Sequence, residues 1–315
     1  VGRILAGLVT LWCVSVLIFA ATQALPSDPA RAILGRSATP QGIQQLRSEL
    51  ELDKPVFDQY TGWITGVVQG DFGSSVGEIA RRPVSEIIEP RLVNSGVLML
   101  IAAIVSIPLS LFLGALSALK RDRAFDHATS ITSLVIAAAP EFVVGVTLIL
   151  LFGTGVFHLF PPVSLIDPGV SVLQQSSKLV LPALTLILAI VPYVSRMVRA
   201  SVAEVLESDY IEMARLKGLS PAYIVARHAL PNAIVPAISL TALQFAYLAG
   251  GVVVVEYVFG YPGIGSSLVE AVSNRDLPTI QAITLLIGGL YVVVNLLADV
   301  ATIFISPRLR TAYQT

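Results

Sequence analysis

Polar side chains within long apolar stretches are the first residues of this sequence that offer chemistry. Glu141 follows Pro140 in an otherwise apolar run, and Gln244 lies in another such run. Asn295 and Asp299 lie four residues apart in a third, so a helix would place them on one face, suited to an inter-helix polar contact. Because polar groups in apolar surroundings usually face a cavity or a partner, we expect Glu141 and Gln244 to line a cavity, with helix packing as the alternative.

The polar segment 196–231 carries more helix-boundary signals than a connector needs. Asp209 is predicted to cap a helix whose third position is Glu212, which would make a capping box. Gly218 follows that helix at the place where a left-handed closing residue belongs.

A second short helix is predicted directly after this glycine. Ser220 and Pro221 begin it, because serine caps a helix and proline fits the first helical position. It runs to about Leu230, and Pro231 ends it. The pattern predicts two helices joined by a glycine, and on its own it suits a docking element or a solvated hairpin equally.

Charge is scarce along the chain. The 315 residues carry 20 basic and 21 acidic side chains, 13% in all, where soluble domains have about 25%. Hydrophobic residues make up 55%. The net charge of −1 gives no electrostatic reason to bind nucleic acid, and the single cysteine, Cys13, excludes an intrachain disulfide or a multi-cysteine zinc site. The composition therefore indicates a membrane protein.

Six apolar stretches are long enough to cross a bilayer as helices, which predicts an all-α polytopic membrane protein. Their approximate bounds are 4–25, 92–119, 129–152, 179–194, 233–255 and 280–305. The third contains Pro140 and Glu141, and the fourth is the shortest. We interpret the first as a retained span, because it is too long for the apolar region of a signal peptide and no small-x-small site precedes Pro26.

Lysine and arginine in the connecting segments predict the orientation. With a cytoplasmic N-terminus, eleven of them fall on the inside and two, Lys178 and Arg275, in short outer loops. The other seven lie in the long outer segment, which the positive-inside rule does not govern. Both termini are therefore predicted to be cytoplasmic.

The spans divide the chain into three predicted parts. Residues 1–26 form the first transmembrane helix, 27–91 an extracytoplasmic cap segment, and 92–315 a five-helix core that includes the cytoplasmic loop 196–231. Within the cap segment, Thr39 and Pro40 predict the start of a helix. That segment suits either a cap on the outer helix ends or a docking surface for an external partner.

The loop 196–231 resembles the EAA motif of ABC importer membrane subunits. That motif has the pattern E-A-A, three residues, G, nine residues, I-x-L-P, and the sequence departs from it at Met213 and His228. The matching residues are Glu212, Ala214, Gly218, Leu230 and Pro231.

The resemblance covers nearly the whole chain and narrows to the B-type membrane subunit of dipeptide and oligopeptide permeases. The outer segment contains the similar stretches LPSDPARAILG, LRSELELDKPVFDQY and GDFGSS. Later stretches of the same kind are SDYIEMARLKGLSP, RHALPNAIVP and VVVEYVFGYPGIGSSLVEAVSNRD. The closing SPRLR resembles the D-P-R motif of the family, with Ser306 in place of aspartate.

The resemblance implies a type I ABC importer permease fold with six transmembrane helices in a bacterial cell membrane. It implies coupling to cytoplasmic ATPases through Asp209, Glu212, Ala214, Gly218, Leu230 and Pro231. The expected partners are the lipid bilayer, a second homologous permease subunit, two ATPase subunits or a fused ATPase, and an extracytoplasmic peptide-binding protein. No G-x-x-x-x-G-K-[ST] run is present, so ATP and Mg are expected on the partner ATPases, with no cofactor and no catalysis in this chain.

The substrate stays open at this stage. Di- or oligopeptides are expected, with glutathione, nickel or another peptide-like solute as alternatives. Glu141 and Gln244 are candidates to line the translocation path, and Glu141 is a candidate to attract the ammonium group of a peptide. An ion-coupled secondary transporter is a rival function, although it would not need the loop 196–231. An intramembrane enzyme is a further rival, but the sequence has no H-E-x-x-H or G-x-S-x-G motif.

Overall fold

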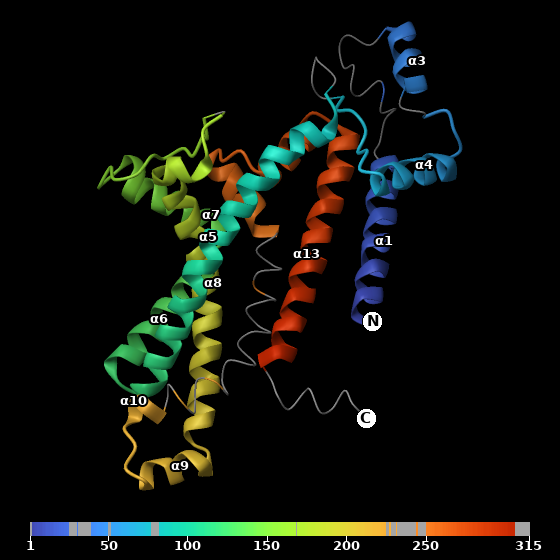
Figure 1. The fold of residues 1–315 in the computed structure, drawn as a ribbon. Coiled ribbons are helices and arrows are strands. Elements are labelled where there is room, and N and C mark those ends of the chain that lie inside the picture. The colour runs from blue at the N-terminus through green and yellow to red at the C-terminus, as the bar shows by residue number, and fades with distance from the viewer. Residues whose placement is uncertain are drawn as a thin grey trace. The chain divides into compact units, whose positions relative to one another are not determined.

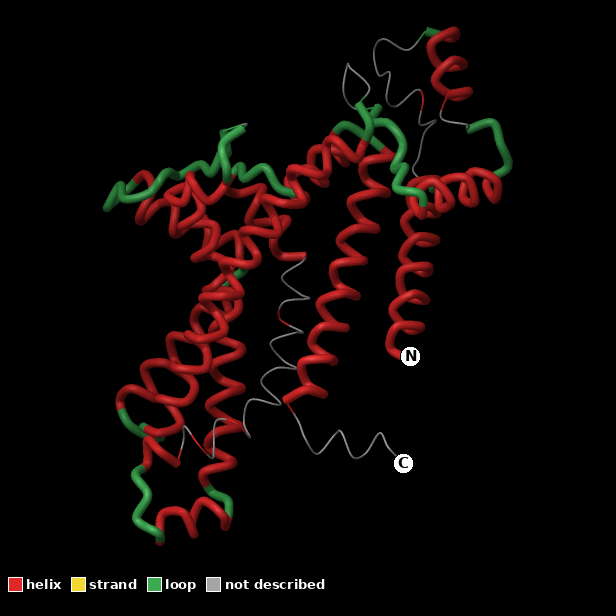
Figure 2. The backbone as a smooth tube through the Cα atoms, viewed as in Figure 1, coloured by secondary structure: helices red, strands yellow, loops and turns green. Residues whose placement is uncertain are grey.

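Helices dominate the described chain. The computed structural model describes residues 2–24, 39–49, 52–76, 82–167, 169–224 and 250–305, together with residues 30, 227, 231 and 244. Figure 2 shows helices joined by loops, and the described residues contain no β-strand, apart from an isolated bridge between Ser74 and Pro83. The predicted all-α class is confirmed. The chain divides into two compact units, residues 1–95 with 262–292 and residues 96–261 with 293–315, called here the first and second units.

The first unit contains both an N-terminal helix and later segments of the chain (Figure 1). Its elements are α1 (Gly2–Gln23), α3 (Pro40–Glu49), α4 (Val56–Val68), the start of α5 (Val84–Leu119), α12 (Ile264–Ser273) and the first part of α13 (Leu277–Ile305). The predicted cap of α3 is confirmed, because Thr39 Oγ1 accepts a hydrogen bond from the Gly42 amide at 3.1 Å. This unit holds the predicted first span and all the described residues of the predicted cap segment.

Helices α1 and α13 of the first unit pack closely along their length. A Cβ atom on Gly7 would lie only 2.6 Å from Val292 Cγ1, so glycine allows the two helices to approach. Gln281 Nε2 of α13 also donates a 2.8 Å hydrogen bond to Thr22 Oγ1 of α1, and both side chains are buried. A small residue and a satisfied polar pair are the usual means of joining apolar helices.

The second unit is built around the long helix α8. Its elements are the remainder of α5, α6 (Ala124–Ala138), α7 (Glu141–Leu148) with the π-helical turn Ile149–Thr154, the 3₁₀ turn Val172–Gln175, α8 (Ser176–Leu206), α9 (Asp209–Leu216), α10 (Pro221–Ile224), the helical segment Gly250–Phe259 and the end of α13. Much of α8 is buried, including Leu186, Val194 and Val198. A Cβ on Gly114 of α5 would lie 2.6 Å from Ser195 O, so α5 approaches the backbone of α8 directly.

Among the residues that the structure describes, four helices are long and apolar enough to cross a membrane, and up to six spans result if each of two bent pairs is counted as one. The four candidate spans are Gly2–Gln23, Val84–Leu119, Val172–Leu206 and Leu277–Leu297. The fourth predicted span, 179–194, thus lies within a much longer candidate span. Of the fifth predicted span, 233–255, only the part from Gly250 and the single residue Gln244 lie within the described residues.

The third predicted span, 129–152, is not one continuous helix. It contains the end of α6 and all of α7, which are bent by 105° at Ala139 and Pro140. Ala139 has the extended conformation, with φ −87° and ψ 132°, which a residue before proline favours. Proline also lacks the amide that would continue the helix. Glu141 therefore lies at the first position of α7, not in the middle of a helix.

Candidate functional site

The predicted capping box at the start of α9 is wrong by one residue. Ser208 occupies the N-cap position, with extended backbone (ψ 148°), and no side chain makes a capping hydrogen bond there. Asp209 is the first helical residue, so its side chain and that of Glu212 lie exposed in the first turn. Acidic residues at this position still favour the helix, because they face the positive end of its dipole.

Gly218 closes α9 as predicted. Its φ is +77°, the left-handed region that favours glycine. The amide of Gly218 donates to Arg215 O at 2.9 Å, and the amide of Leu219 donates to Ala214 O at 3.3 Å. These two bonds form a Schellman motif, and Leu219 packs against the small apolar cluster that contains Ala214.

The second helix of the predicted pair also begins as expected. Ser220 Oγ accepts a hydrogen bond from the Tyr223 amide at 3.3 Å, and Pro221 is the first residue of α10. The described part of α10 ends at Ile224. Of the two motif residues beyond it, Leu230 lies outside the described residues, and Pro231 is an exposed helical residue. We call residues 209–224 the coupling hairpin, after the role that the resemblance leads us to expect for this loop.

The coupling hairpin has a buried face and an exposed apolar face. Ile211, Ala214 and Ile224 form a small core against Leu206 and Leu219, and Ala214 is 8% exposed. On the opposite face, the large apolar side chains are exposed, at 47% for Tyr210, 56% for Met213 and 76% for Leu216. Ala214 therefore supports the hairpin from within, and the exposed apolar surface belongs to its neighbours.

Two ion pairs hold the end of α8 that carries the hairpin (Figure 1). Arg199 binds both carboxylate oxygens of Asp126, at 2.5 and 2.6 Å, and the Asp126 side chain is 3% exposed. Asp126 also accepts a 3.1 Å hydrogen bond from the Asp122 amide. A second ion pair joins Arg121 to Glu207 and is mostly exposed to solvent. Buried and bidentate contacts of the first kind fix geometry better than exposed pairs.

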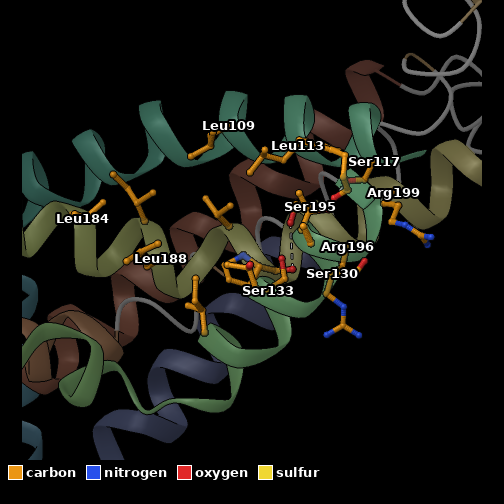
Figure 3. A pocket seen from close by; sticks show the side chains of 18 residues that line it. Leu109, Leu113, Ser117, Ser130, Ser133, Leu184, Leu188, Ser195, Arg196 and Arg199 are labelled. Carbon is orange, nitrogen blue, oxygen red and sulfur yellow. Dashed lines mark hydrogen bonds between the residues drawn. The ribbon is translucent and has the colours of Figure 1, made fainter. Parts of the chain in front are cut away.

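A cavity of about 350 Å³ lies between α5, α6 and α8 of the second unit (Figure 3). Leucines from α5 and α8 supply apolar walls, and Ser117, Ser130, Ser133 and Ser195 add hydroxyl groups. Figure 3 shows Arg196 and Arg199 at one end, with their guanidinium groups directed away from the leucines. The walls are mainly apolar, so this cavity suits hydrocarbon better than a polar solute.

A second cavity of the same unit, of about 390 Å³, contains Glu141. The residues 136–142 around the break line it, together with Val144, with Ala189 and Tyr193 of α8, and with Val254. Tyr193 Oη donates a 3.2 Å hydrogen bond to Ala137 O, which joins α8 to the end of α6. Glu141 therefore lies beside a cavity, and Tyr193 is a polar neighbour that sequence reasoning did not single out.

The other predicted polar residues are less informative. Gln244 is half-buried, and its sequence neighbours lie outside the described residues. Asn295 and Asp299 of α13 are half-buried, one helical turn apart, and both make contacts within the chain. The structure does not bring either of them to Glu141 among the residues that line its cavity.

Known families and relatives match this chain over nearly all of its sequence. Residues 108–311 match the family described as "Binding-protein-dependent transport system inner membrane component", and residues 1–85 match "Binding-prot-dependent transport system membrane comp, N-term". The chain is 37% identical over 311 residues to a "Probable peptide ABC transporter permease protein y4tP" of Sinorhizobium fredii (strain NBRC 101917 / NGR234), covering 98% of this chain and 97% of the relative.

Other relatives of equal identity carry a different name. The chain is 37% identical over 310 residues to the "Glutathione transport system permease protein GsiC" of Escherichia coli (strain K12), covering 98% of both proteins. The protein of the same name from Salmonella choleraesuis (strain SC-B67) is 37% identical over 308 residues, covering 98% of this chain and 97% of the relative.

Proposed function

Because this chain belongs to the binding-protein-dependent transport system inner membrane component family, we propose that it is a membrane-spanning subunit of an ATP-driven importer, forming half of the pathway for di- or oligopeptides. The observation that carries the proposal is the coupling hairpin, a compact and locally closed element with exposed apolar side chains. The peptide permease and glutathione permease names of the relatives support peptides and peptide-like solutes as substrates. Nickel is an alternative substrate for the same importer class.

The proposed topology has six spans, type I permease fold and both termini in the cytoplasm. The four long candidate helices and the bent pair of α6 and α7 supply five of the six spans, and the fifth predicted span, 233–255, lies mostly outside the described residues. Residues 1–26 are then the first span, 27–91 the extracytoplasmic cap, and 92–315 the core with the loop 196–231 on the cytoplasmic side. The eleven-to-two distribution of basic residues supports this orientation.

The proposed partners are the other components of such a transport system. They are a second homologous permease subunit, two ATPase subunits or one fused ATPase that bind ATP and Mg, and an extracytoplasmic peptide-binding protein. The chain would sit in the inner membrane of a bacterium, bind no nucleic acid and perform no catalysis. An ion-coupled secondary transporter is the weaker alternative, because the coupling hairpin would then have no partner.

In the proposed mechanism, the coupling hairpin transmits motion from the ATPase to the spans. ATP binding closes the ATPases, which moves the hairpin and shifts the population between two arrangements of the spans. Asp209, Glu212, Ala214, Gly218, Leu230 and Pro231 shape or flank the hairpin, and Tyr210, Met213 and Leu216 are its proposed contact surface. Because the Asp126–Arg199 pair joins α8 to α6, a displacement at α9 would move both helices together.

Residues deeper in the spans are proposed to handle substrate and subunit contacts. Glu141 and Gln244 are proposed to line the translocation path. Asn295 and Asp299 are proposed to make a polar contact with another helix or with the second permease subunit. The cavity that Glu141 lines supports its assignment to the translocation path.

The docking assignment is tested by placing a charge on the exposed face of α9. Leu216→Asp should abolish co-purification of the ATPase and ATP-driven import into proteoliposomes, because an apolar contact would bury an unpaired carboxylate. Val68→Asp is the matched control, since Val68 is an apolar residue of similar exposure, 83% against 76%, in the other unit. If Leu216→Asp retains ATPase binding and import at the level of Val68→Asp, the hairpin is not the docking element.

A further inference from the structure

The cavity beside the α6–α7 break gathers hydrogen-bond acceptors from three places in the second unit. Glu141 contributes a carboxylate at the first position of α7, and Tyr193 contributes a phenol oxygen from α8. Ala138 and Ala139 also line the cavity, and their backbone carbonyls lie at the break itself. The remaining lining side chains are apolar.

These acceptors are largely unused within the described chain. The Glu141 carboxylate makes no hydrogen bond or ion pair with any described residue, and no described amide donates to the carbonyls of Ala138 and Ala139. Tyr193 uses its proton on Ala137 O, which leaves the lone pairs of its oxygen available. Among the described residues that line the cavity, no lysine, arginine or histidine is present.

Unused acceptors are costly in a span that crosses a bilayer, because neither lipid nor neighbouring side chains supply donors there. Glu141, the first residue of α7, is the only acidic side chain among the described residues that line this cavity. The arrangement therefore favours a ligand that brings both a positive charge and several N–H donors. A primary ammonium group has one charge and three N–H donors, which matches the carboxylate, phenol and carbonyl acceptors.

A glycine makes room for the Glu141 side chain. A Cβ atom on Gly251 would lie 2.5 Å from Glu141 Oε2 and 2.8 Å from Oε1. The carboxylate therefore lies against the bare backbone of the helical segment Gly250–Phe259, and any larger residue would displace it. Gly251 is buried, so the space is not filled by solvent.

We propose that this cavity binds the primary ammonium group of the transported solute, with Glu141 as its counter-ion, Tyr193 as a second acceptor and Gly251 as the residue that leaves space for the carboxylate. The proposal rests on the proposed function and narrows its substrate class to solutes with a free amino group. The permease then discriminates among solutes after the binding protein has released them.

The test compares import of free and blocked amines by the assembled importer in proteoliposomes. The probes are L-alanyl-L-alanine and glutathione, each against its N-acetyl form. Glu141→Gln should lower kcat/KM for the free amines about tenfold and leave the N-acetyl forms unchanged, because a charge-assisted hydrogen bond is lost only with the ammonium. The same binding protein serves every variant, so its own preference cancels in the ratio of variant to wild type.

Three further variants separate recognition from packing. Glu141→Asp keeps the charge and should retain part of the preference for free amines, whereas Glu89→Gln, which alters an exposed glutamate of α5, should behave as wild type. Tyr193→Phe should lower import of free amines about threefold, since a neutral hydrogen bond is weaker.

The role of Gly251 is tested by a double-mutant cycle. Gly251→Ala should lower free-amine import as much as Glu141→Gln does, because the new methyl group displaces the carboxylate. In a Glu141→Ala background the same change should have no further effect on the free-to-blocked ratio, because no carboxylate remains to displace.

Three results would overturn the proposal in distinguishable ways. Import of both free amines by wild type with equal import by Glu141→Gln would remove the subsite and leave the importer assignment intact. Equal loss for free and N-acetyl forms would show that Glu141 supports packing or carries a proton. If wild type imports neither free amine but imports Ni²⁺, both the substrate class and the ammonium subsite fail together.

Discussion

The coupling hairpin and the α6–α7 break are both interruptions of helix in the second unit, yet they differ in how their polar groups are satisfied. In the hairpin, the amides of Gly218 and Leu219 bond to carbonyls of α9, and Ser220 caps α10. At the break, the carbonyls of Ala138 and Ala139 and the Glu141 carboxylate have no partner within the described chain. We call the hairpin the closed interruption, because its backbone groups are paired, and the break the open interruption, because its acceptors are unpaired among the described residues. A closed interruption can transmit force as a rigid body, and an open one can receive a ligand.

The largest expected effect comes from the ion pair that holds the hairpin end of α8. Asp126→Ala should lower the free energy of unfolding by about 3 kcal/mol, because it leaves the Arg199 charge without its buried partner. Thermal unfolding of the purified protein measures the change. The break should be affected less than the hairpin, so import should lose its coupling to ATP hydrolysis before it loses its preference among solutes.

The exposed ion pair on the same end of α8 is the matched control. Arg121→Ala removes the partner of Glu207, and both side chains are more than half exposed. We expect a cost of about 0.3 kcal/mol, as for other solvent-exposed pairs. Equal costs for the Asp126 and Arg121 variants would show that burial of Asp126 does not stiffen the support of the hairpin.

The second prediction concerns the closing glycine of α9. Gly218→Ala should cost about 1 kcal/mol, because the residue keeps φ near +77° and a Cβ there is strained although nothing lies within 4 Å of it. Gly62→Ala supplies a control of opposite sign. Gly62 lies inside α4 with nothing within 4 Å of a Cβ, so alanine should stabilise by about 0.5 kcal/mol. A stabilising Gly218→Ala would contradict the Schellman closure.

Local signals allowed the closed interruption to be predicted well from sequence. The glycine at 218, the serine and proline at 220 and 221, and the threonine at 39 act on backbone groups two to four residues away. The error at Asp209 has the same local scale, because Ser208 was an equally good cap one residue earlier. Each of these features depends on a few neighbouring residues, which the sequence shows directly.

The features that the sequence did not predict depend on contacts between residues far apart in the chain. Asp126 and Arg199 are 73 residues apart, so their pairing depends on how α6 packs on α8. The proline at 140 signalled a bend, but its size of 105° depends on how α7 packs on α8 and on the segment Gly250–Phe259. That same packing brings Tyr193 and Gly251 next to Glu141. An acidic residue in an apolar run marked the site, but its partners required the fold.

The third prediction tests what maintains the open interruption. Pro140→Ala should lower the free energy of unfolding by about 0.7 kcal/mol, because proline restricts the unfolded chain and also keeps Ala139 extended. Pro55→Ala is the control, since Pro55 precedes α4 with φ −52°, close to the −58° of Pro140. Both variants should lose similar stability, but only Pro140→Ala should weaken the preference for free amines. An unchanged preference would show that packing alone holds the break open.

The smallest expected effect separates stability from coupling. Ser220→Ala should cost about 0.5 kcal/mol, at the low end for a helix cap, because its hydrogen bond to the Tyr223 amide is long at 3.3 Å and exposed. Thr39→Ala removes a similar exposed cap, with a 3.1 Å bond, from α3 in the other unit and should cost about the same. If the hairpin transmits force, only Ser220→Ala should reduce the amount of solute imported per ATP hydrolysed, since only that cap lies in the element proposed to contact the ATPase. Equal import per ATP in the two variants, at equal loss of stability, would mean that the closed end of α10 has no part in coupling.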